Sequence, residues 1–332
     1  MTDRANIIPG NDDGVTRAAI HLQACRLVAF PTETVYGLGA DARDDQAVAR
    51  IFEAKNRPSF NPLIVHVLDV DAASLYGVLD ERARQLSDTF WPGPLSFVVP
   101  RRPDCTLSLL VSAGLDSVAL RAPVHPLARD LLAKFGGPIA APSANTAGEV
   151  SPTHATHVAQ SLGAKADMIL DGGACAVGLE STVIDLCSEQ PALLRHGAIT
   201  HEQLEDILGP VEDATHPVDG TAPRSPGQLA RHYAPRIPVR LNARDTGPDE
   251  ALLCFGHSTF GNPETTLNLS PTGDLTEAAA NLFAFLRQLD TPHHRAIAVT
   301  PIPETDLGRA INDRLRRAAE AHADPKNDPR KG

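Results

Sequence analysis

Apolar residues recur every three or four positions in several stretches of the first 135 residues, which is the spacing of one helix face. The helices predicted from this spacing span residues 12–22, 44–55, 80–90 and 125–135. Asp12 or Asp13 can cap the first of them. Short apolar runs between and after the helices predict strands at 26–30, 63–67, 95–99, 117–123 and 138–141, a loop that feeds a strand at 179–185, and an edge-like strand with a turn at 192–197. Strands that alternate with helices predict an α/β domain with a mixed sheet.

The pattern changes at residue 209, where apolar periodicity stops and prolines and glycines become frequent. A long connection without regular structure is usually a linker or a functional lid. Beyond it, strands are predicted at 239–241, 251–255, 266–269 and 296–299, and helices at 276–289 and 305–321. We therefore predict a first domain over 1–208, a Pro/Gly-rich linker over 209–238, a smaller α/β domain over 239–323 and a disordered tail over 324–332.

The composition is that of a globular protein: 42% of the 332 residues are apolar and 21% are charged. The formal net charge of −11 argues against a broad surface for nucleic acid or acidic lipid, because such surfaces need clustered Lys and Arg. Aromatic residues, at 4%, provide few stacking platforms for single-stranded RNA. We expect no tight nucleic-acid binding, and a local basic cleft is still compatible with these values.

The five cysteines are scattered and form no C-x-x-C pair, so neither a disulfide framework nor a zinc ribbon is indicated. His154 and His157 lie one helical turn apart without a third ligand, so no dedicated metal site is predicted. The N-terminal residues contain no apolar signal region, and no run approaches the roughly 18 apolar residues of a membrane helix. These features predict a cytoplasmic protein with reduced thiols and no membrane association.

Two cations lie where the second predicted helix ends. Lys55 and Arg57 flank Asn56, and Pro58 and Pro62 prevent the helix from continuing. If this turn faces a cleft, the Lys ammonium and the Arg guanidinium would suit phosphate oxygens. Cations at a helix C-terminus also complement the helix dipole in solvent. On these residues alone, a solvated helix end is the simpler interpretation.

Two further patterns match known motifs only in part. Gly37 and Gly39 would permit positive φ or a close approach of the backbone to a ligand, but they lack the third glycine of a dinucleotide fingerprint. Ser143 and Asn145 follow a predicted strand without a nucleophile elbow. We interpret these two as hydrogen-bonding groups on a loop.

Eight segments, taken in order, resemble the YrdC-like family. They are PTETVYGLGADA, KNRPSFNPLIVH, WPGP, SVALRAP, APSAN, GLESTVID, LRHGAI and SPGQLARHYAP. The linker and the second domain resemble the long, two-domain form of this family, although residues 228–230 replace the Met-Lys-aromatic run that is common there. The resemblance implies a catalytic domain with a twisted mixed β-sheet and flanking helices over 1–208, a linker over 209–238 that acts as an active-site lid, and a smaller Rossmann-like α/β domain over 239–323.

The resemblance also implies a reaction. L-threonine, bicarbonate and ATP would give L-threonylcarbamoyl-adenylate and pyrophosphate, which makes the protein a nucleotidyltransferase. Mg²⁺ would bind mainly through the ATP phosphates. A separate transferase complex, a transient partner, would then move the threonylcarbamoyl group to the adenosine next to the tRNA anticodon. The alternative is an RNA-binding module of the YrdC-like type without its own catalysis.

The resemblance assigns residues to the two substrates. The ATP-binding residues would be Lys55, Arg57, Ser59, Ser117, Ser143, Asn145, Ser151, Arg195 and Tyr233, with Lys55 and Arg57 as the catalytic cations. The threonine pocket would be formed by Thr32, His66, Arg121, Ala141 and Ser181. Arg121 is the natural bidentate partner of the threonine carboxylate. Glu33 is the nearest acidic candidate for a base, and a structural role for Glu33 is an equal alternative.

Overall fold

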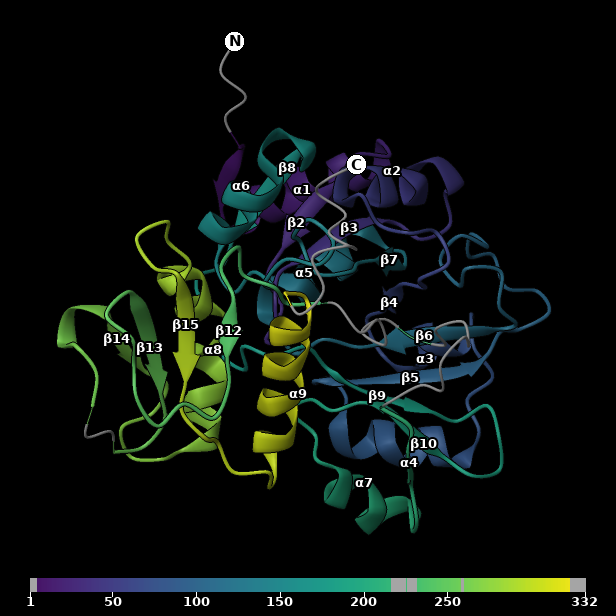
Figure 1. The fold of residues 1–332 in the computed structure, drawn as a ribbon. Helices are drawn as coiled ribbons and strands as arrows, with labels where there is room; N and C mark the ends of the chain where they lie inside the picture. The colour runs from purple at the N-terminus through teal and green to yellow at the C-terminus, as the bar shows by residue number, and fades with distance from the viewer. Residues whose placement is uncertain (1–4, 216–224, 226–231, 258–259, 323–332) are drawn as a thin grey trace. The chain divides into compact units, whose positions relative to one another are not determined.

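The computed structural model describes residues 5–215, 225, 232–257 and 260–322 (Figure 1). The chain forms two compact units, each built from more than one segment. The first unit comprises Met1–Ala147, Pro152–Ala176 and Glu180–Gln228. The second unit comprises Gly148–Ser151, Val177–Leu179 and Leu229–Gly332. Two short segments from the first 208 residues therefore belong to the second unit.

A mixed sheet of eleven strands forms the centre of the first unit. In the order of the sheet, its strands are β1 (Ile7–Pro9), β8 (Met168–Asp171), β2 (Val28–Phe30), β3 (Gly37–Asp41), β7 (Ile139–Ala140), β4 (Ile64–His66), β6 (Ser117–Arg121), β5 (Leu95–Pro100), β9 (Thr182–Asp185), β10 (Ala192–Arg195) and β11 (Glu212–Asp213). The sheet contains parallel pairs such as β4 with β6 and antiparallel pairs such as β5 with β6. The predicted mixed sheet is confirmed.

Helices connect these strands. They are α1 (Asp12–Gln23), α2 (Asp45–Lys55), α3 (Val70–Ser74), α4 (Glu81–Phe90), α5 (Pro126–Phe135), α6 (Ala155–Leu162), a short 3-10 helix (Gly163–Lys165) and α7 (His201–Leu208). The prediction for the cap of α1 is wrong: the Asn11 side chain accepts from Gly14 N at 2.9 Å. Asn11 has the extended backbone that capping requires, whereas Asp12 and Asp13 are already helical.

The sheet of the first unit buries apolar side chains on both faces. Val28 and Phe30 pack with α1 and α5 in one apolar cluster, whereas Ala29 between them belongs to a second cluster that includes residues of α2, α4 and α6. This is the alternation expected along a strand. Leu22 of α1 and Leu131 of α5 are both fully buried in the first cluster.

The structure corrects the expectation that Gly37 and Gly39 serve a loop with positive φ. Both lie in β3 and neither has positive φ, so they do not form a glycine loop. A Cβ atom on Gly39 would lie 2.8 Å from Phe30 Cε1 and 2.9 Å from Ile139 Cγ2. Glycine is needed here because neighbouring side chains of the core pack directly on the strand backbone.

The second unit contains a parallel sheet of four strands. Their order is β12 (Val239–Arg240), β15 (Ala296–Val299), β13 (Glu250–Cys254) and β14 (Thr266–Asn268). A 3-10 helix (Pro263–Thr265) precedes β14, and two long helices, α8 (Leu275–Leu289) and α9 (Leu307–Glu320), pack beside the sheet (Figure 1). Leu282, Phe283 and Leu286 of α8 are fully buried. The predicted smaller α/β domain is confirmed.

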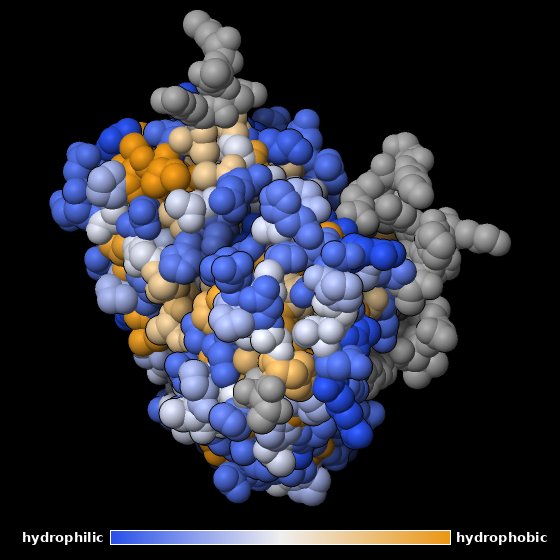
Figure 2. Space-filling model, turned by 60° about the vertical axis from the view of Figure 1, so that its left-hand side comes forward, coloured by the Kyte–Doolittle hydropathy of each residue, from blue (hydrophilic) through white to orange (hydrophobic). Residues whose placement is uncertain are grey.

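Among the described residues, no helix combines the length and the apolar character needed to cross a membrane. Figure 2 shows a face on which hydrophilic side chains predominate and apolar ones gather in small groups. Scattered apolar groups of this kind are normal on a protein surface.

Candidate active site

Two predicted site residues end two neighbouring strands of the first unit. β4 and β6 run parallel, and His66 and Arg121 are partners in their register. Each is the last residue of its strand, and both are buried. Ligands in open α/β sheets bind at the carboxyl ends of parallel strands. The fold therefore places these two side chains together at a position suited to a ligand.

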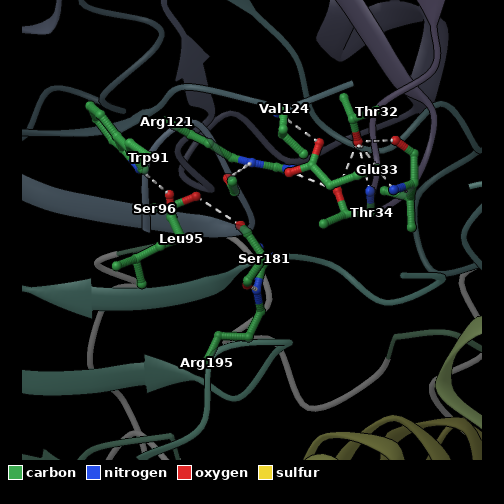
Figure 3. A network of polar contacts seen from close by, with 12 residues as sticks. Thr32, Glu33, Thr34, Trp91, Leu95, Ser96, Arg121, Val124, Ser181 and Arg195 are labelled. Carbon is green, nitrogen blue, oxygen red and sulfur yellow. Dashed lines mark hydrogen bonds and ion pairs between the residues drawn. The ribbon is translucent and has the colours of Figure 1, made fainter. Parts of the chain in front are cut away.

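Three protein groups hold the Arg121 guanidinium (Figure 3). Its Nε donates to Gly93 O at 3.2 Å, Nη1 to Thr34 Oγ1 at 2.9 Å and Nη2 to Glu33 Oε1 at 2.5 Å. The other carboxylate oxygen of Glu33 accepts from Val124 N at 3.2 Å. Both oxygens of Glu33 are thus engaged with N–H donors, which suits a carboxylate that orients Arg121 better than one that takes a proton.

Thr32 fixes the loop that carries Glu33 and Thr34. Its hydroxyl donates to Val35 O at 2.7 Å and lies 2.8 Å from the Thr34 hydroxyl. The Thr32 hydroxyl has one proton, and it donates that proton to the Val35 carbonyl. The Thr34 hydroxyl therefore donates to Thr32 and accepts from Arg121. Thr34 is a site residue that the sequence analysis missed. The predicted residue Thr32 is linked to Arg121 through the Thr34 hydroxyl.

His66 presents a neutral ring beside Arg121. It is 3% exposed, and its ring meets the Phe30 ring edge-on with the centroids 5.9 Å apart. Burial, followed by the nearby charge of Arg121, lowers the pKa of His66 to about 3. Within the described residues, its Nδ1 has no hydrogen-bond partner. A buried polar atom of this kind is a candidate contact for a ligand.

Arg195 and Ser181 form a second group of polar contacts (Figure 3). Arg195 Nε donates to the Ser181 carbonyl at 2.9 Å, and Nη2 donates to the Ser181 hydroxyl at 3.0 Å. The Ser96 hydroxyl lies 2.7 Å from that of Ser181, and all three residues are buried. The structure thus joins a residue predicted for ATP to one predicted for threonine. Ser96 was missed by the sequence analysis.

Lys55 is buried, so the interpretation of its helix end as solvated is wrong. It is the last residue of α2 and is 1% exposed. Its Nζ donates to Ser143 O at 2.5 Å and also to Asn145 O. The helix turns away immediately afterwards, because Asn56 adopts the left-handed conformation with φ 50°. A positive charge is therefore held inside the fold against the segment that carries two predicted ATP-binding residues.

The segment from Ala141 to Asn145 is itself fixed to the sheet. Ala141 N donates to Ile64 O at 3.0 Å, and Ala144 N donates to Tyr36 O at 2.8 Å. Arg57, two residues after Lys55, is half-buried and donates from Nη2 to Pro62 O at 2.9 Å. The cationic turn and this segment therefore have defined positions before any ligand binds.

Most of the predicted residues of the first unit fall into two groups. Around the carboxyl ends of β4 and β6 lie Thr32, His66, Arg121, Ser181 and Arg195. Around the end of α2 lie Lys55, Ser143 and Asn145, whereas Ala141, predicted for threonine, donates from its backbone N to Ile64 O of β4. Ser117 begins β6 and Arg121 ends it, so at about 3.3 Å per residue they are roughly 13 Å apart. Ser59 is exposed on the turn.

Ser151 and Tyr233 belong to the second unit. The Tyr233 ring is buried there, stacked on Phe283 with the centroids 5.4 Å apart and with the Arg314 guanidinium 5.3 Å from its centroid. Half of the predicted lid, 216–224 and 226–231, lies outside the described residues, and this half includes residues 228–230. The assignment of Tyr233 to ATP and the lid both stay predictions.

Two family models match the chain. One, described as telomere recombination and built on the proteins Sua5, YciO and YrdC, matches residues 21–197. The other, described as the C-terminal domain of threonylcarbamoyl-AMP synthase, matches residues 199–320. Each predicted domain thus contains residues matched by one of the two models.

The similarity to known proteins extends over nearly the whole chain. The threonylcarbamoyl-AMP synthase of Bacillus subtilis is 40% identical over 338 residues, which cover 96% of each chain. The threonylcarbamoyl-AMP synthase of Pyrococcus abyssi is 38% identical over 320 residues, which cover 91% of this chain and 93% of that one. The crystal structure of P. abyssi Sua5 in complex with L-threonine matches with a TM-score of 0.86 and 36% identity over 95% of this chain and 97% of that one.

Proposed function

The chain belongs to the threonylcarbamoyl-AMP synthase family, in its two-domain form, and we propose that it joins L-threonine, bicarbonate and ATP into L-threonylcarbamoyl-adenylate with release of pyrophosphate. The observation that carries this proposal is the buried Arg121 guanidinium, held in one orientation beside His66 at the ends of two parallel strands. Such a group is prepared to bind the carboxylate of an amino acid.

The donor count of Arg121 supports this role. An arginine side chain carries five N–H donors, and within the described residues Gly93, Thr34 and Glu33 accept from three of those of Arg121. The remaining donors can pair with both oxygens of one carboxylate. The amino group of L-threonine then stays available for reaction. The neutral ring of His66 can hydrogen-bond to the substrate without adding charge.

The chemistry requires cations because two anionic partners must meet. The threonine nitrogen first attacks bicarbonate and gives a carbamate, with loss of water. A carbamate oxygen then attacks the α-phosphorus of ATP, the bond from that phosphorus to the bridging oxygen breaks, and its electron pair leaves with pyrophosphate. This is nucleotidyl transfer. Lys55, Arg57 and Arg195 would neutralise the phosphates, and a preformed charge such as that of Lys55 needs no reorganisation at the moment of reaction.

Mg²⁺ would enter with ATP and supply further neutralisation of the phosphates. In the described part of the chain, no group of three or more His, Cys, Asp or Glu side chains is arranged to hold a metal ion. We propose that the phosphates and water provide most of its ligands. The product would pass to a transferase complex that modifies the adenosine next to the tRNA anticodon, in a transient encounter. The RNA-binding alternative is not favoured, because the similar proteins are named as synthases.

A pyrophosphate assay tests the proposed function. Purified protein with ATP and Mg²⁺ is expected to release pyrophosphate only when L-threonine and bicarbonate are both present. Mass spectrometry should then detect threonylcarbamoyl-adenylate in equal amount, with omission of each substrate in turn as the control. Absence of pyrophosphate with all substrates present, or release that does not depend on threonine, would contradict the proposal.

Glu33 offers a separate prediction because it acts through Arg121. We expect Glu33→Gln to raise the KM for L-threonine about tenfold, since loss of a buried ion pair loosens the guanidinium, and to change the KM for ATP less than about twofold. Initial rates with each substrate varied in turn measure this split. Asp104→Asn, which removes an exposed carboxylate paired with Arg102, is the control and should change neither constant. If Glu33 were instead the essential base, kcat would fall by orders of magnitude and KM would stay nearly constant.

A further inference from the structure

Helix α8 of the second unit contacts two short segments that come from the first 208 residues of the chain. These are Gly148–Ser151 and Val177–Leu179. Each lies within two residues of a group assigned to a substrate: Ser151 is the predicted ATP-binding residue itself, and Leu179 precedes Ser181, predicted for threonine, by two positions. The contacts of α8 with these segments can therefore influence both substrates.

Arg287 makes the first contact. From the last turn of α8, its Nη2 donates to Val150 O, and its Nε lies 3.5 Å from Ser151 O. Val150 and Ser151 are both buried, and Arg287 is half-buried. Desolvation lowers the pKa of Arg287, opposed by the charges of Glu149 and Asp290, and a guanidinium remains charged in a protein regardless. Two consecutive carbonyl groups thus face one fixed cation.

A second set of backbone contacts holds the same segment. Ala234 N donates to Gly148 O at 2.8 Å, and Glu149 and Ala234 form an isolated parallel bridge. Ala234 follows Tyr233, whose ring is stacked on Phe283 of α8. The segment around Ser151 is therefore held from α8 directly and also through the chain next to Tyr233.

Gly178 forms the contact between α8 and the other segment, Val177–Leu179. Its φ is +73°, and a Cβ atom placed on it would lie 2.5 Å from Ala280 Cα and 2.6 Å from Ala279 O. These are backbone atoms of α8, so no side chain can turn aside to make room. The backbone of Val177–Leu179 packs directly on the helix, and any larger residue would separate them.

We propose that α8 is a positioning element for both substrates: Arg287 fixes the backbone of Ser151 for ATP, and the contact at Gly178 fixes the start of the segment that carries Ser181 for L-threonine. The proposal rests on the proposed function through the assignment of these two serines. It gives α8 a role in substrate binding through the two segments that it holds. The two contacts should be separable, since each lies on a different segment.

The test measures direct binding of ATP with Mg²⁺ and of L-threonine to the full chain by calorimetric titration. Arg287→Met keeps the apolar stem and removes the guanidinium. It is expected to raise the Kd for ATP about tenfold and to leave that for L-threonine within about twofold. Arg316→Met, which removes an exposed arginine paired with Glu304 on the same unit, is the matched control and should change neither.

Gly178→Ala is expected to give the opposite split, with a rise of about fivefold in the Kd for L-threonine and a smaller change for ATP. Gly173→Ala is its matched control: it has the same left-handed strain, at φ +79°, and no atom within 4 Å of the added Cβ. Thermal unfolding shows whether each variant folds. If Arg287→Met or Gly178→Ala does not fold, the other variant and its control test the proposal.

Two results would overturn the proposal: each folded variant binds both substrates as its control does, or both Kd values rise by the same factor, which indicates general loosening. Binding is measured without turnover, so these results are independent of the pyrophosphate assay. A wild-type chain that binds both substrates but releases no pyrophosphate would contradict the proposed function alone.

Discussion

Replacing Arg121 with alanine is expected to lower kcat/KM for L-threonine by a factor of about 100 to 1,000, because a buried bidentate partner of the substrate carboxylate is lost. The KM for ATP should change by less than about threefold, since the cations assigned to the phosphates lie on other elements. Initial rates with each substrate varied in turn measure both constants. Equal effects on both substrates would contradict the assignment of Arg121 to threonine.

The same replacement leaves the buried carboxylate of Glu33 without its cation, so loss of folding has to be separated from loss of binding. An unpaired buried charge destabilises a fold by about 3 to 5 kcal/mol. Adding Glu33→Gln to Arg121→Ala should restore part of the unfolding temperature without restoring threonine binding. Arg121→Lys is the conservative comparison: it keeps a charge beside Glu33 but loses the planar fork.

Replacing Lys55 with methionine is the second large effect that we expect. The variant should raise the KM for ATP and lower kcat, with a combined loss of about 100-fold or more, because a fixed charge near the phosphates is removed in a buried setting. Binding of L-threonine should stay within about twofold. Steady-state kinetics together with threonine titration measure the two effects separately.

A matched lysine controls for the loss of charge. Lys134→Met removes a lysine whose ion pair with Asp12 is exposed, and it should change neither kinetic constant. Lys55→Met also leaves the carbonyls of Ser143 and Asn145 without this donor, so some loss of stability is expected. If threonine binding fell as much as ATP binding, Lys55 would act mainly by holding the segment that it contacts.

The local spacing of apolar residues predicted several of the longer helices well. Helices α2, α4 and α5 begin and end within a residue or two of their predicted bounds, because apolar spacing and a capping side chain or an N-terminal proline act on the same few residues. Some of the short elements were missed. β1 and β8 have three and four residues, and they are strands because Ile7 and Ile169, far apart in the chain, pair with each other. No local pattern encodes that pairing.

The candidate site also divides into features that local sequence predicts and features that depend on long-range contacts. His66 and Arg121 could be placed near the ends of predicted strands from sequence, whereas the partners of Arg121 could not. Glu33 and Thr34 contact it across 88 and 87 positions of the chain, and only the folded sheet brings them together. One local signal was present: the polar run of residues 32–34 begins two residues after a buried apolar strand. Polar residues in such a position are buried only when they have partners.

The turn between α2 and β4 has a consequence for how the chain can change. Ile64 and His66 lie on one face of the sheet and Val65 on the other, because side chains alternate along a strand. Inserting or deleting one residue between Lys55 and Ile64 would shift the strand by one position and turn His66 to the opposite face, unless the turn absorbed the change. The length of this turn is therefore under constraint even where its residues are exposed. Substitutions at an exposed position such as Phe60 can be tolerated where a change of length cannot.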